Sequence, residues 1–343
     1  MQFLQLGSAL KLANEGYYRS KGTRIYRDFD TVARCCPLVA QADAQEFASR
    51  KKGAAGAQAI YDFGIGEGSF AFDFLDEVRK RDEGLYGQTG YALCDISRKL
   101  LDEALKSERG KAHASRLKAV EVDASGPFEF SADYVRSNEM YDDLAASMLV
   151  MRKGKVCEVL FSPDGKEKQY AESGAAIPAA MRKMLEKCEG YELALNSGAV
   201  AHLRNAMKAL KRGGWIDIYD YGYSGVEEIL EEPAEVWNEG TVREYGGQLT
   251  VDVNFELLAD EARACKCRAG IERVSERLED AFGRKFSFVD LREGRGKTWV
   301  GYMDEAEVRK NAAMLKKAGY SKEFMDGEVV EEDAYLHLRI EKD

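Results

Sequence analysis

The sequence predicts a doubly wound α/β fold with a parallel sheet, and three observations predict it. Short apolar segments alternate with amphipathic, helix-like segments between residues 57 and 137. In the first of these repeats, the stretch AIYDFGIGEGSF changes from an apolar run to closely spaced glycines and then to a helix start, an order typical of ligand-binding α/β sheets. A further strand-like segment, residues 215–221, follows a helix and a glycine-containing turn. Repeated alternation of this kind favours parallel strands joined by right-handed crossovers.

The elements of this repeat can be predicted in order. We expect strands at residues 57–63, 89–96, 117–122, 133–137 and 215–221, because these segments are apolar or alternate in polarity. Phe70, Phe74 and Val78 recur at helical spacing, which predicts a helix over residues 69–81. Ser97 is a typical N-cap residue and predicts the start of the next helix.

The chain outside this repeat is expected to add helices, a hairpin and a last strand. Residues 1–47 are interpreted as helical, with a break at residues 16–18 and an aromatic loop at residues 24–31 that is either a cap over the core or a lid over a ligand. A hairpin is expected around a turn at residues 162–165. The remaining predicted elements are helices at residues 43–54, 178–189, 200–210, 255–264, 271–284, 305–318 and 321–326, and a strand at residues 334–340.

These elements predict a division of the chain into three parts. The first is a helical N-terminal or lid segment at residues 1–54. The second is a ligand-binding core at residues 55–255, with an insertion at about residues 148–198. The third, residues 256–343, consists of accessory helices and a terminal strand that completes the core sheet.

Composition disfavours several classes of function. The 343 residues are 45% hydrophobic and 32% charged, as in a soluble globular protein, and the net charge of −10 disfavours a nucleic-acid partner. The 7 Cys lack zinc-like spacing and the 3 His are scattered, so we expect reduced thiols and no metal site. The sequence has no apolar run long enough for a bilayer and no signal-peptide core at its N-terminus. We therefore expect a cytoplasmic protein without a membrane partner.

The glycine turn consists of Gly64, Gly66 and Gly68. This spacing alone is a weak signal for a nucleotide site. The dinucleotide fingerprint requires a glycine where this chain has Ser69, and no Gly-Lys-Ser/Thr of a phosphate-binding loop follows. The turn therefore argues against NAD, FAD and nucleoside triphosphates, although its glycines would still let a ligand approach the backbone.

Three aspartates lie at the ends of the first three predicted strands: Asp62, Asp95 and Asp123. The carboxyl ends of parallel strands meet at one edge of the sheet, where ligands bind. An acid after the second strand can accept both hydroxyls of a ribose, and an acid after the third can meet the amine of an adenine. This acidic rim suits a ligand with a positive centre and no phosphates, and we expect S-adenosyl-L-methionine (SAM). The alternative is that these aspartates are ordinary strand-end caps.

Further motifs give the sequence a resemblance to a known family. The glycine turn followed by Asp95-Ile96-Ser97 is similar to class I SAM-dependent methyltransferases, and residues 16–255 resemble the MidA family, whose mitochondrial relatives are complex I assembly-factor methyltransferases. The other motifs that carry the resemblance are Gly16-Tyr17-Tyr18, Asp28-Phe29-x-Thr31, Ser137-Asn138-Glu139-x-x-Asp142, Asp220-Tyr221-Gly222 and Leu249-Thr250-x-Asp252-Val253-Asn254-Phe255. The positions at which this chain departs from the family pattern are Arg27, Ala33-Arg34, Ala145, Tyr223 and Asn254.

The resemblance implies a Rossmann-like class I methyltransferase sheet with a helical N-terminal extension and an inserted and C-terminal accessory region. It implies a SAM site made by Tyr18, Asp28, Thr31, Asp62, Gly64, Gly66, Gly68, Asp95, Ile96, Asp123 and Asn138. It also implies in-line methyl transfer to a protein side chain, with arginine as the acceptor. We expect Glu139, with Asp142 nearby, to pair with the guanidinium and localise its charge, and Asn138 to position the substrate or the methionine part of SAM. The alternative for Asn138-Glu139 is a strand-end turn that leads into a helix.

Two other functions stay open from the sequence. One is a SAM-binding assembly scaffold with little turnover, which the departures at Arg27 and Arg34 favour. The other is a small-molecule methyltransferase. A protein substrate is the expected partner. Whether the inserted segments bind a partner or form a homodimer stays open from the sequence.

Overall fold

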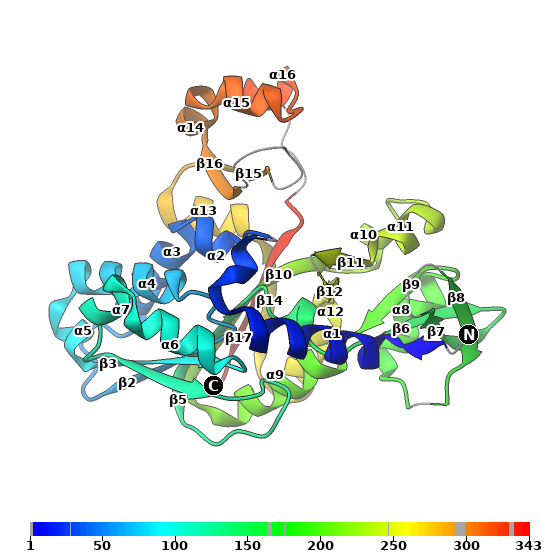
Figure 1. Cartoon of the computed structure of the whole chain (residues 1–343), viewed down its shortest axis with the longest axis horizontal. Helices are drawn as coiled ribbons and strands as arrows, with labels where there is room; N and C mark the ends of the chain where they lie inside the picture. The colour runs from blue at the N-terminus through cyan, green and yellow to red at the C-terminus, as the bar shows by residue number, and fades with distance from the viewer. Residues whose placement is uncertain are drawn as a thin grey trace. The chain divides into compact units, whose positions relative to one another are not determined.

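The structure is a computed structural model and describes residues 3–27, 29–162, 167–174, 176–245, 247–291, 299–328 and 333–343. Its elements are labelled in Figure 1. The chain divides into two compact units that interleave along the sequence. Unit 1 contains Met1–Lys21, Val122–Ile271 and Leu338–Asp343, and unit 2 contains Gly22–Glu121 and Glu272–His337. The division into residues 1–54, 55–255 and 256–343 stays a prediction.

Unit 2 contains the first three predicted strands of the repeat. They form a parallel sheet in the order β2 (Gln58–Phe63), β3 (Thr89–Asp95) and β4 (Leu117–Glu121). The connecting helices are α4 (Ser69–Arg81), α5 (Glu83–Gln88), α6 (Arg98–Lys106) and α7 (Glu108–Ala112). Helix α4 begins and ends at the predicted residues, which confirms the prediction. Its apolar stripe of Phe70, Phe74 and Val78 is buried. The prediction that Ser97 caps α6 is also confirmed, since its side chain accepts a hydrogen bond from the Leu100 N–H.

Three short helical elements precede this sheet in unit 2. They are the 3-10 helix η1 (Gly22–Arg27), α2 (Val32–Cys35) and α3 (Leu38–Arg50). Helix α3 begins earlier than the helix predicted from residue 43. It packs on α4, where the ring centroids of Phe47 and Phe74 are 5.5 Å apart. Of the aromatic loop expected at residues 24–31, residues 24–27 belong to the 3-10 helix η1, and residues 29–31 lie outside any helix or strand.

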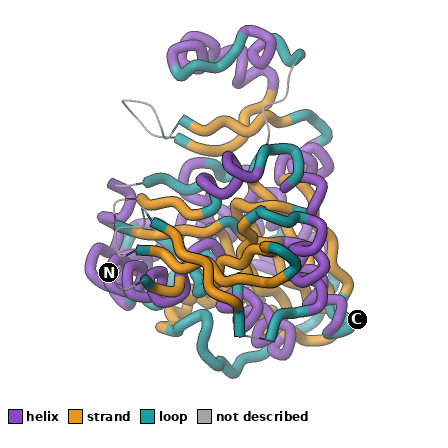
Figure 2. Tube along the Cα trace, turned by 90° about the vertical axis from the view of Figure 1, so that its right-hand side faces the viewer, coloured by secondary structure: helices purple, strands orange, loops and turns teal. Residues whose placement is uncertain are grey.

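The C-terminal part of unit 2 differs from the prediction. The helix expected at residues 271–284 is α13 (Val274–Phe282), which begins later than predicted because the residues before it belong to a strand, β14 (Arg268–Arg273). The hairpin of β15 (Phe286–Asp290) and β16 (Val300–Asp304) was not predicted. It lies below the helices α14 (Glu305–Lys310), α15 (Ala312–Lys317) and α16 (Lys322–Met325) in both views (Figures 1 and 2). Val289, Met303 and Phe324 are among the buried residues that join hairpin and helices.

Unit 1 contains the parallel pair of β5 (Ala132–Asn138) and β10 (Leu210–Tyr223). Their register places Tyr219 opposite Asn138, so the carboxyl ends of both strands lie side by side. The strand order continues from β10 to β17 (Tyr335–Glu341) and then to β14. The predictions of a strand over residues 215–221 and of a terminal strand are therefore confirmed, and helices α9 (Ser197–Ala209) and α12 (Phe255–Ala264) occur where they were expected.

The insertion in unit 1 forms an antiparallel sheet. Its path is β1 (Leu4–Gln5), β7 (Lys155–Phe161), β6 (Ser147–Arg152) and β9 (Glu192–Leu195), with β8 (Lys168–Glu172) paired to β7. Helix α8 (Ala179–Lys187) packs on β6 through Met181 and Leu185. The predicted hairpin is present as β7–β8, but residues 163–166 of its turn lie outside the described residues. A separate hairpin joins β11 (Val242–Tyr245) and β12 (Gln248–Val251).

Helix α1 (Leu6–Lys21) contradicts the predicted break at Gly16. Leu6, Leu10, Asn14 and Tyr17 are buried at helical spacing on one face of α1. Burial of this face outweighs the roughly 1 kcal/mol that a glycine costs inside a helix. The sequence prediction weighed the local glycine more heavily than the continuous buried stripe.

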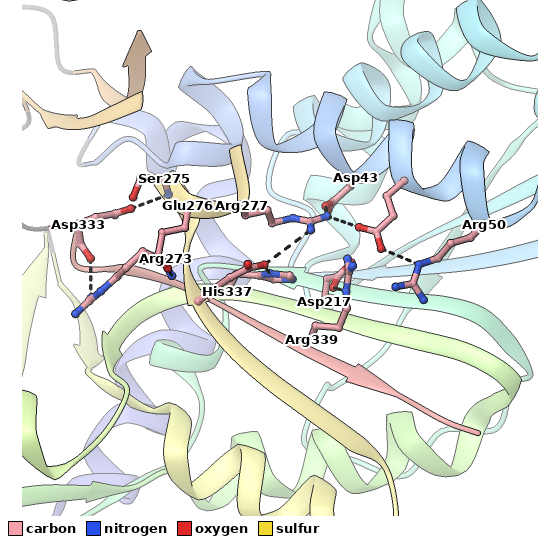
Figure 3. A network of polar contacts seen from close by, with 12 residues as sticks. Asp43, Arg50, Asp217, Arg273, Ser275, Glu276, Arg277, Asp333, His337 and Arg339 are labelled. Atoms are coloured by element: carbon pink, nitrogen blue, oxygen red, sulfur yellow. Dashed lines mark hydrogen bonds and ion pairs between the residues drawn. The ribbon is translucent and has the colours of Figure 1, made fainter. Parts of the chain in front are cut away.

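Polar networks that the sequence did not reveal lie inside each unit (Figure 3). In unit 2, the Arg277 guanidinium of α13 pairs with Asp43 at 2.5 Å and with Glu46 at 3.0 Å, both on α3. In unit 1, the Arg339 Nε of β17 donates to Asp217 Oδ1 of β10 at 2.8 Å. Each network fixes one C-terminal element against an element from much earlier in the chain.

Candidate functional site

The glycine turn after β2 has the backbone that its sequence predicts. Gly64, Gly66 and Gly68 have φ values of 75°, 54° and 85°, in the left-handed region that side chains other than glycine rarely adopt. The Gly64 N–H donates to the Cys94 carbonyl at 2.9 Å, which ties the turn to the end of β3. Gly68 is the N-cap of α4, so the turn leads directly into the helix.

Two of the predicted acids lie at the carboxyl ends of neighbouring strands of unit 2. Asp62 is opposite Leu93 in the β2–β3 register, and Asp95 is two residues further along β3. Asp62 is 2% exposed and accepts a hydrogen bond from the Tyr91 hydroxyl at 2.8 Å. Asp95 accepts from the Ser97 N–H at 2.8 Å, and burial raises its pKa from 3.8 to about 7, against the lowering effect of backbone hydrogen bonds. This end of the β2–β3 pair is therefore lined by two carboxyl groups that the fold has largely removed from water.

Four other residues predicted at the cofactor lie in different parts of the structure or outside the described residues. Ile96 directly follows Asp95 and is partly buried. The Thr31 hydroxyl caps α2 by accepting from the Arg34 N–H at 3.3 Å. Asp123 belongs to unit 1, where it is exposed and accepts from the Ser125 N–H at 2.8 Å in a local turn. Asp28 lies outside the described residues. For each of these four residues, a role at the cofactor stays a prediction.

The predicted catalytic residues gather at the end of β5 in unit 1. Asn138 is the last residue of the strand, and its Nδ2 donates to Glu139 Oε1 at 3.0 Å. Glu139 has a φ of 46°, a left-handed conformation that is uncommon outside glycine. The Glu139 N–H donates to the Tyr219 carbonyl of β10 at 2.9 Å, which fixes this turn against the neighbouring strand.

Asp220 organises the segment that follows Glu139. Its Oδ2 accepts hydrogen bonds from the backbone N–H groups of Met140 at 3.1 Å, Tyr141 at 2.8 Å and Asp142 at 3.3 Å. Asp220 is completely buried, and burial followed by the charges of Asp142 and Glu139 raises its pKa well above the usual range. Sequence reasoning assigned Asp220 no role, although the Asp220-Tyr221-Gly222 motif marked its position.

Asp143, Tyr18 and Gln248 form a second hydrogen-bond network in the same unit. The Tyr18 hydroxyl of α1 donates to Asp143 Oδ2 at 2.5 Å, and Gln248 Nε2 donates to both the Tyr18 hydroxyl at 2.8 Å and Asp143 Oδ1 at 2.5 Å. Loss of water around Asp143, followed by the charge of Asp142, raises its pKa well above the usual range. Tyr18 was expected to bind the cofactor, and within unit 1 its hydroxyl contacts Asp143. Its role at the cofactor therefore stays a prediction.

Taken by itself, each unit contains groups whose chemistry suits SAM. The left-handed glycine turn and the buried Asp95 of unit 2 offer backbone close to a ligand and a carboxyl group for ribose hydroxyls. In unit 1, Asn138 is 5% exposed, and its Oδ1 accepts no hydrogen bond from the described residues. A buried amide oxygen of this kind is a suitable acceptor for the ammonium of a methionine moiety.

A family model described as "Putative S-adenosyl-L-methionine-dependent methyltransferase" matches residues 38–271, which is more than half of the chain. The chain belongs to this methyltransferase family. SAM is therefore its cofactor, and the predictions of a SAM-dependent methyltransferase and of SAM as the ligand are confirmed at this level. Among the described residues, no group of His, Cys, Asp and Glu side chains is arranged to hold a metal ion.

Two crystal structures of proteins from Burkholderia thailandensis are similar to this methyltransferase. One, bound to S-adenosyl-homocysteine, has a TM-score of 0.68 and 18% sequence identity, covering 99% of this chain and 88% of that chain. The other, a native structure, has a TM-score of 0.65 and 18% identity, covering 99% and 87%. At this identity the likeness concerns the fold, and it confirms the predicted Rossmann-like α/β class. No curated protein matches the sequence.

Among the helices of the described residues, none combines the length and the apolar character needed to cross a lipid bilayer.

Proposed function

We propose that this methyltransferase acts on a protein and that its acceptor is an arginine side chain. The observation that carries the proposal is the group of carboxylates in unit 1, which brings Glu139, Asp142, Asp143 and Asp220 to the ends of β5 and β10. The resemblance of the Asn138-Glu139-x-x-Asp142 motif to the MidA family supports the same acceptor.

A cationic acceptor suits this group of carboxylates. Asp143 and Asp220 both have pKa values raised by burial and by the negative charge of Asp142, so additional positive charge would be favourable there. A guanidinium offers five N–H donors in a fixed plane and pairs with carboxylates through two parallel hydrogen bonds. A planar arginine therefore matches several carboxylate oxygens better than a neutral hydroxyl or amide would.

The residues of the chain would prepare the acceptor rather than form a covalent intermediate. When bound, SAM supplies a methyl group on a positively charged sulfur. Glu139 would pair with one side of the guanidinium, concentrate its positive charge there, and orient the opposite nitrogen for in-line transfer. The nitrogen that gains the methyl group must lose a proton, and a carboxylate of the group is the natural acceptor of that proton. Asp220 would act as a positioning residue, because it holds the backbone that follows Glu139.

The test uses SAM labelled in its methyl group, the full-length chain and a cell extract as the source of acceptor proteins. Glu139→Gln keeps the size of the side chain and removes its charge. We expect it to reduce labelling of protein by about 10²-fold or more while affinity for S-adenosyl-homocysteine stays within about threefold, because the interaction lost is electrostatic and lies at the acceptor. Glu186→Gln, at an exposed position of α8 in the same unit, is the matched control and should label normally.

Each alternative function predicts a different outcome of this test. Labelling of small molecules instead of protein would support a small-molecule methyltransferase. Binding of S-adenosyl-homocysteine without any labelling, in wild type and variants alike, would support the assembly scaffold. Equal labelling of protein by wild type and Glu139→Gln would remove Glu139 from the mechanism.

A further inference from the structure

We propose that Tyr26, Arg34 and Glu67 form a clasp that positions the glycine turn and thereby sets the affinity for the cofactor. Tyr26 and Arg34 come from η1 and α2, and Glu67 lies within the turn between Gly66 and Gly68. All three residues belong to unit 2. The inference goes beyond the acceptor proposal, and it rests on the cofactor being held at this glycine turn.

Tyr26 closes over the turn through its hydroxyl. The Glu67 N–H donates to the Tyr26 Oη at 3.1 Å. A Cβ added at Gly66 would be 2.1 Å from the same oxygen, so the hydroxyl occupies the space that a side chain would need at that position. Gly66 is therefore required for two reasons: its φ of 54° and the close approach of Tyr26.

Arg34 holds the clasp together by charge and by stacking. Its Nε pairs with Glu67 Oε1 at 3.3 Å, and its guanidinium lies 4.8 Å from the centre of the Tyr26 ring. Its Nη1 also pairs with Asp30, which is 3% exposed. Arginine stacks on aromatic faces and forms ion pairs at the same time, which lysine does less well. Arg34 is one of the positions at which the chain departs from the family pattern, and the clasp gives this departure a structural role.

Ser69 completes the clasp from the helix side. Its hydroxyl donates to Glu67 Oε1 at 2.8 Å, so the Glu67 carboxylate is bound both by α4 and by α2. The serine that excludes a dinucleotide fingerprint therefore has its own function in the turn. The backbone of Glu67 is fixed by Tyr26 and its side chain by Arg34 and Ser69.

The contacts that fix the glycine turn should contribute more to the affinity for the cofactor than to the free energy of unfolding. Glycines in a turn have many accessible conformations, and a ligand that contacts the turn must order them unless other contacts have done so. The ion pair of Arg34 and Glu67 has side-chain exposures of 35% and 32%, and exposed pairs of this kind contribute little to folding stability. Loss of the Arg34–Glu67 pair by itself, as in Glu67→Gln, should therefore weaken cofactor binding while the free energy of unfolding changes little.

The experiment measures the affinity of the full chain for S-adenosyl-homocysteine by isothermal titration calorimetry. We expect Tyr26→Phe, which loses only the hydroxyl, and Arg34→Ala each to weaken binding by about 5- to 30-fold. Arg34→Lys should recover part of the loss, since it keeps the charge but not the stacking. Arg98→Ala, which breaks the exposed ion pair with Asp102 on α6 of the same unit, is the control and should bind as wild type does.

A double variant separates positioning from a general structural effect. If Arg34 acts through Glu67, Arg34→Ala and Glu67→Gln together should bind no more weakly than the weaker single variant. Thermal unfolding midpoints of Tyr26→Phe and Glu67→Gln should stay near that of wild type. Arg34→Ala also removes a partner of the buried Asp30, so it should unfold at a lower temperature while staying folded at the temperature of the titration. Wild-type affinity in both folded Tyr26→Phe and folded Arg34→Ala would overturn the clasp. Failure of wild type to bind S-adenosyl-homocysteine would overturn both the clasp and the cofactor site. Normal binding by wild type without methyl transfer would count against the acceptor proposal only and would not contradict the clasp.

Discussion

Asp95 is the residue whose protonation the fold changes in a directly measurable way. Its pKa rises from 3.8 to about 7, chiefly because it is buried at the end of β3. Because the folded-state pKa is raised, protonation of Asp95 favours folding. Its contribution to stability is complete below pH 3.8 and is lost as the pH rises through about 7.

We therefore expect the free energy of unfolding of the ligand-free protein to fall between pH 5 and pH 7, by up to about 1.4 kcal/mol per pH unit from this group. Asp95→Asn keeps an acceptor oxygen and cannot titrate, so it should remove this part of the pH dependence. Urea unfolding of both proteins at several pH values measures the difference. A difference between them that stays constant with pH would show that Asp95 titrates normally.

At the scale of single residues, the sequence predicted where a residue lies in its strand better than it predicted the backbone conformation or the contacts of that residue. Asp62 and Asp95 could be predicted at strand ends because strand and turn patterns fix where a strand ends. The left-handed backbone of Glu139 could not, because it depends on the Tyr219 carbonyl of a strand that lies far along the sequence. The contacts of Asp220 were missed for the same reason.

At the scale of elements, predictions held where the local helix signals and the pattern of buried residues indicate the same segment. Helix α4 was predicted at both ends because its apolar stripe and the glycine turn before it indicate the same segment. The break predicted in α1 was wrong because a buried stripe passes through Gly16. The β15–β16 hairpin was missed because its strands pair across an intervening stretch and carry weak signals of their own.

Asn254, which stands where the family pattern has an aspartate, makes contacts at the start of α12 that suit an amide. It is fully buried at the N-cap of α12, where its Oδ1 accepts from the Leu257 N–H at 3.0 Å. Its Nδ2 faces the Ala194 carbonyl at 3.5 Å and the sulfurs of Met181 and Met184. An aspartate would keep the capping oxygen and would place a second oxygen against these acceptors.

We expect Asn254→Asp to reduce the free energy of unfolding by about 1–3 kcal/mol, because it would put a buried carboxylate oxygen against the Ala194 carbonyl and the sulfurs of Met181 and Met184. The matched control is Asp82→Asn at the exposed N-cap of α5, which keeps the capping oxygen and should change stability by less than about 0.5 kcal/mol. Chemical denaturation at neutral pH measures both changes. Equal stability of Asn254→Asp and wild type would mean that the amide nitrogen of Asn254 has no structural role.

At the scale of the whole molecule, the pairs that join distant segments could not be predicted. Asp43 and Arg277 are separated by 234 residues, and Asp217 and Arg339 by 122 residues. Nothing in the local sequence of either partner identifies the other. The sequence predicted that the terminal strand completes the core sheet, but the position of β17 beside β10 and the pairing of α13 with α3 come only from the structure (Figure 3).

Removal of one partner of such a buried pair should be costly. The Asp43 side chain is fully buried, and that of Arg277 is 9% exposed. We expect Arg277→Ala to reduce the free energy of unfolding by about 3–5 kcal/mol, because it leaves a buried carboxylate without its counterion. Arg284→Ala breaks a pair with Asp304 whose arginine is 56% exposed and should cost less than about 1 kcal/mol. Similar losses in both variants would contradict this account of unit 2.

The central claim concerns the acceptor, and identification of the methylated residue tests it most directly. Protein from a cell extract would be incubated with the full chain and SAM labelled in its methyl group, digested, and analysed by mass spectrometry. The account predicts label on the guanidinium nitrogens of arginine, in amounts that fall by about 10²-fold or more with Glu139→Gln. Label on lysine, on a carboxylate or on a small molecule would contradict it.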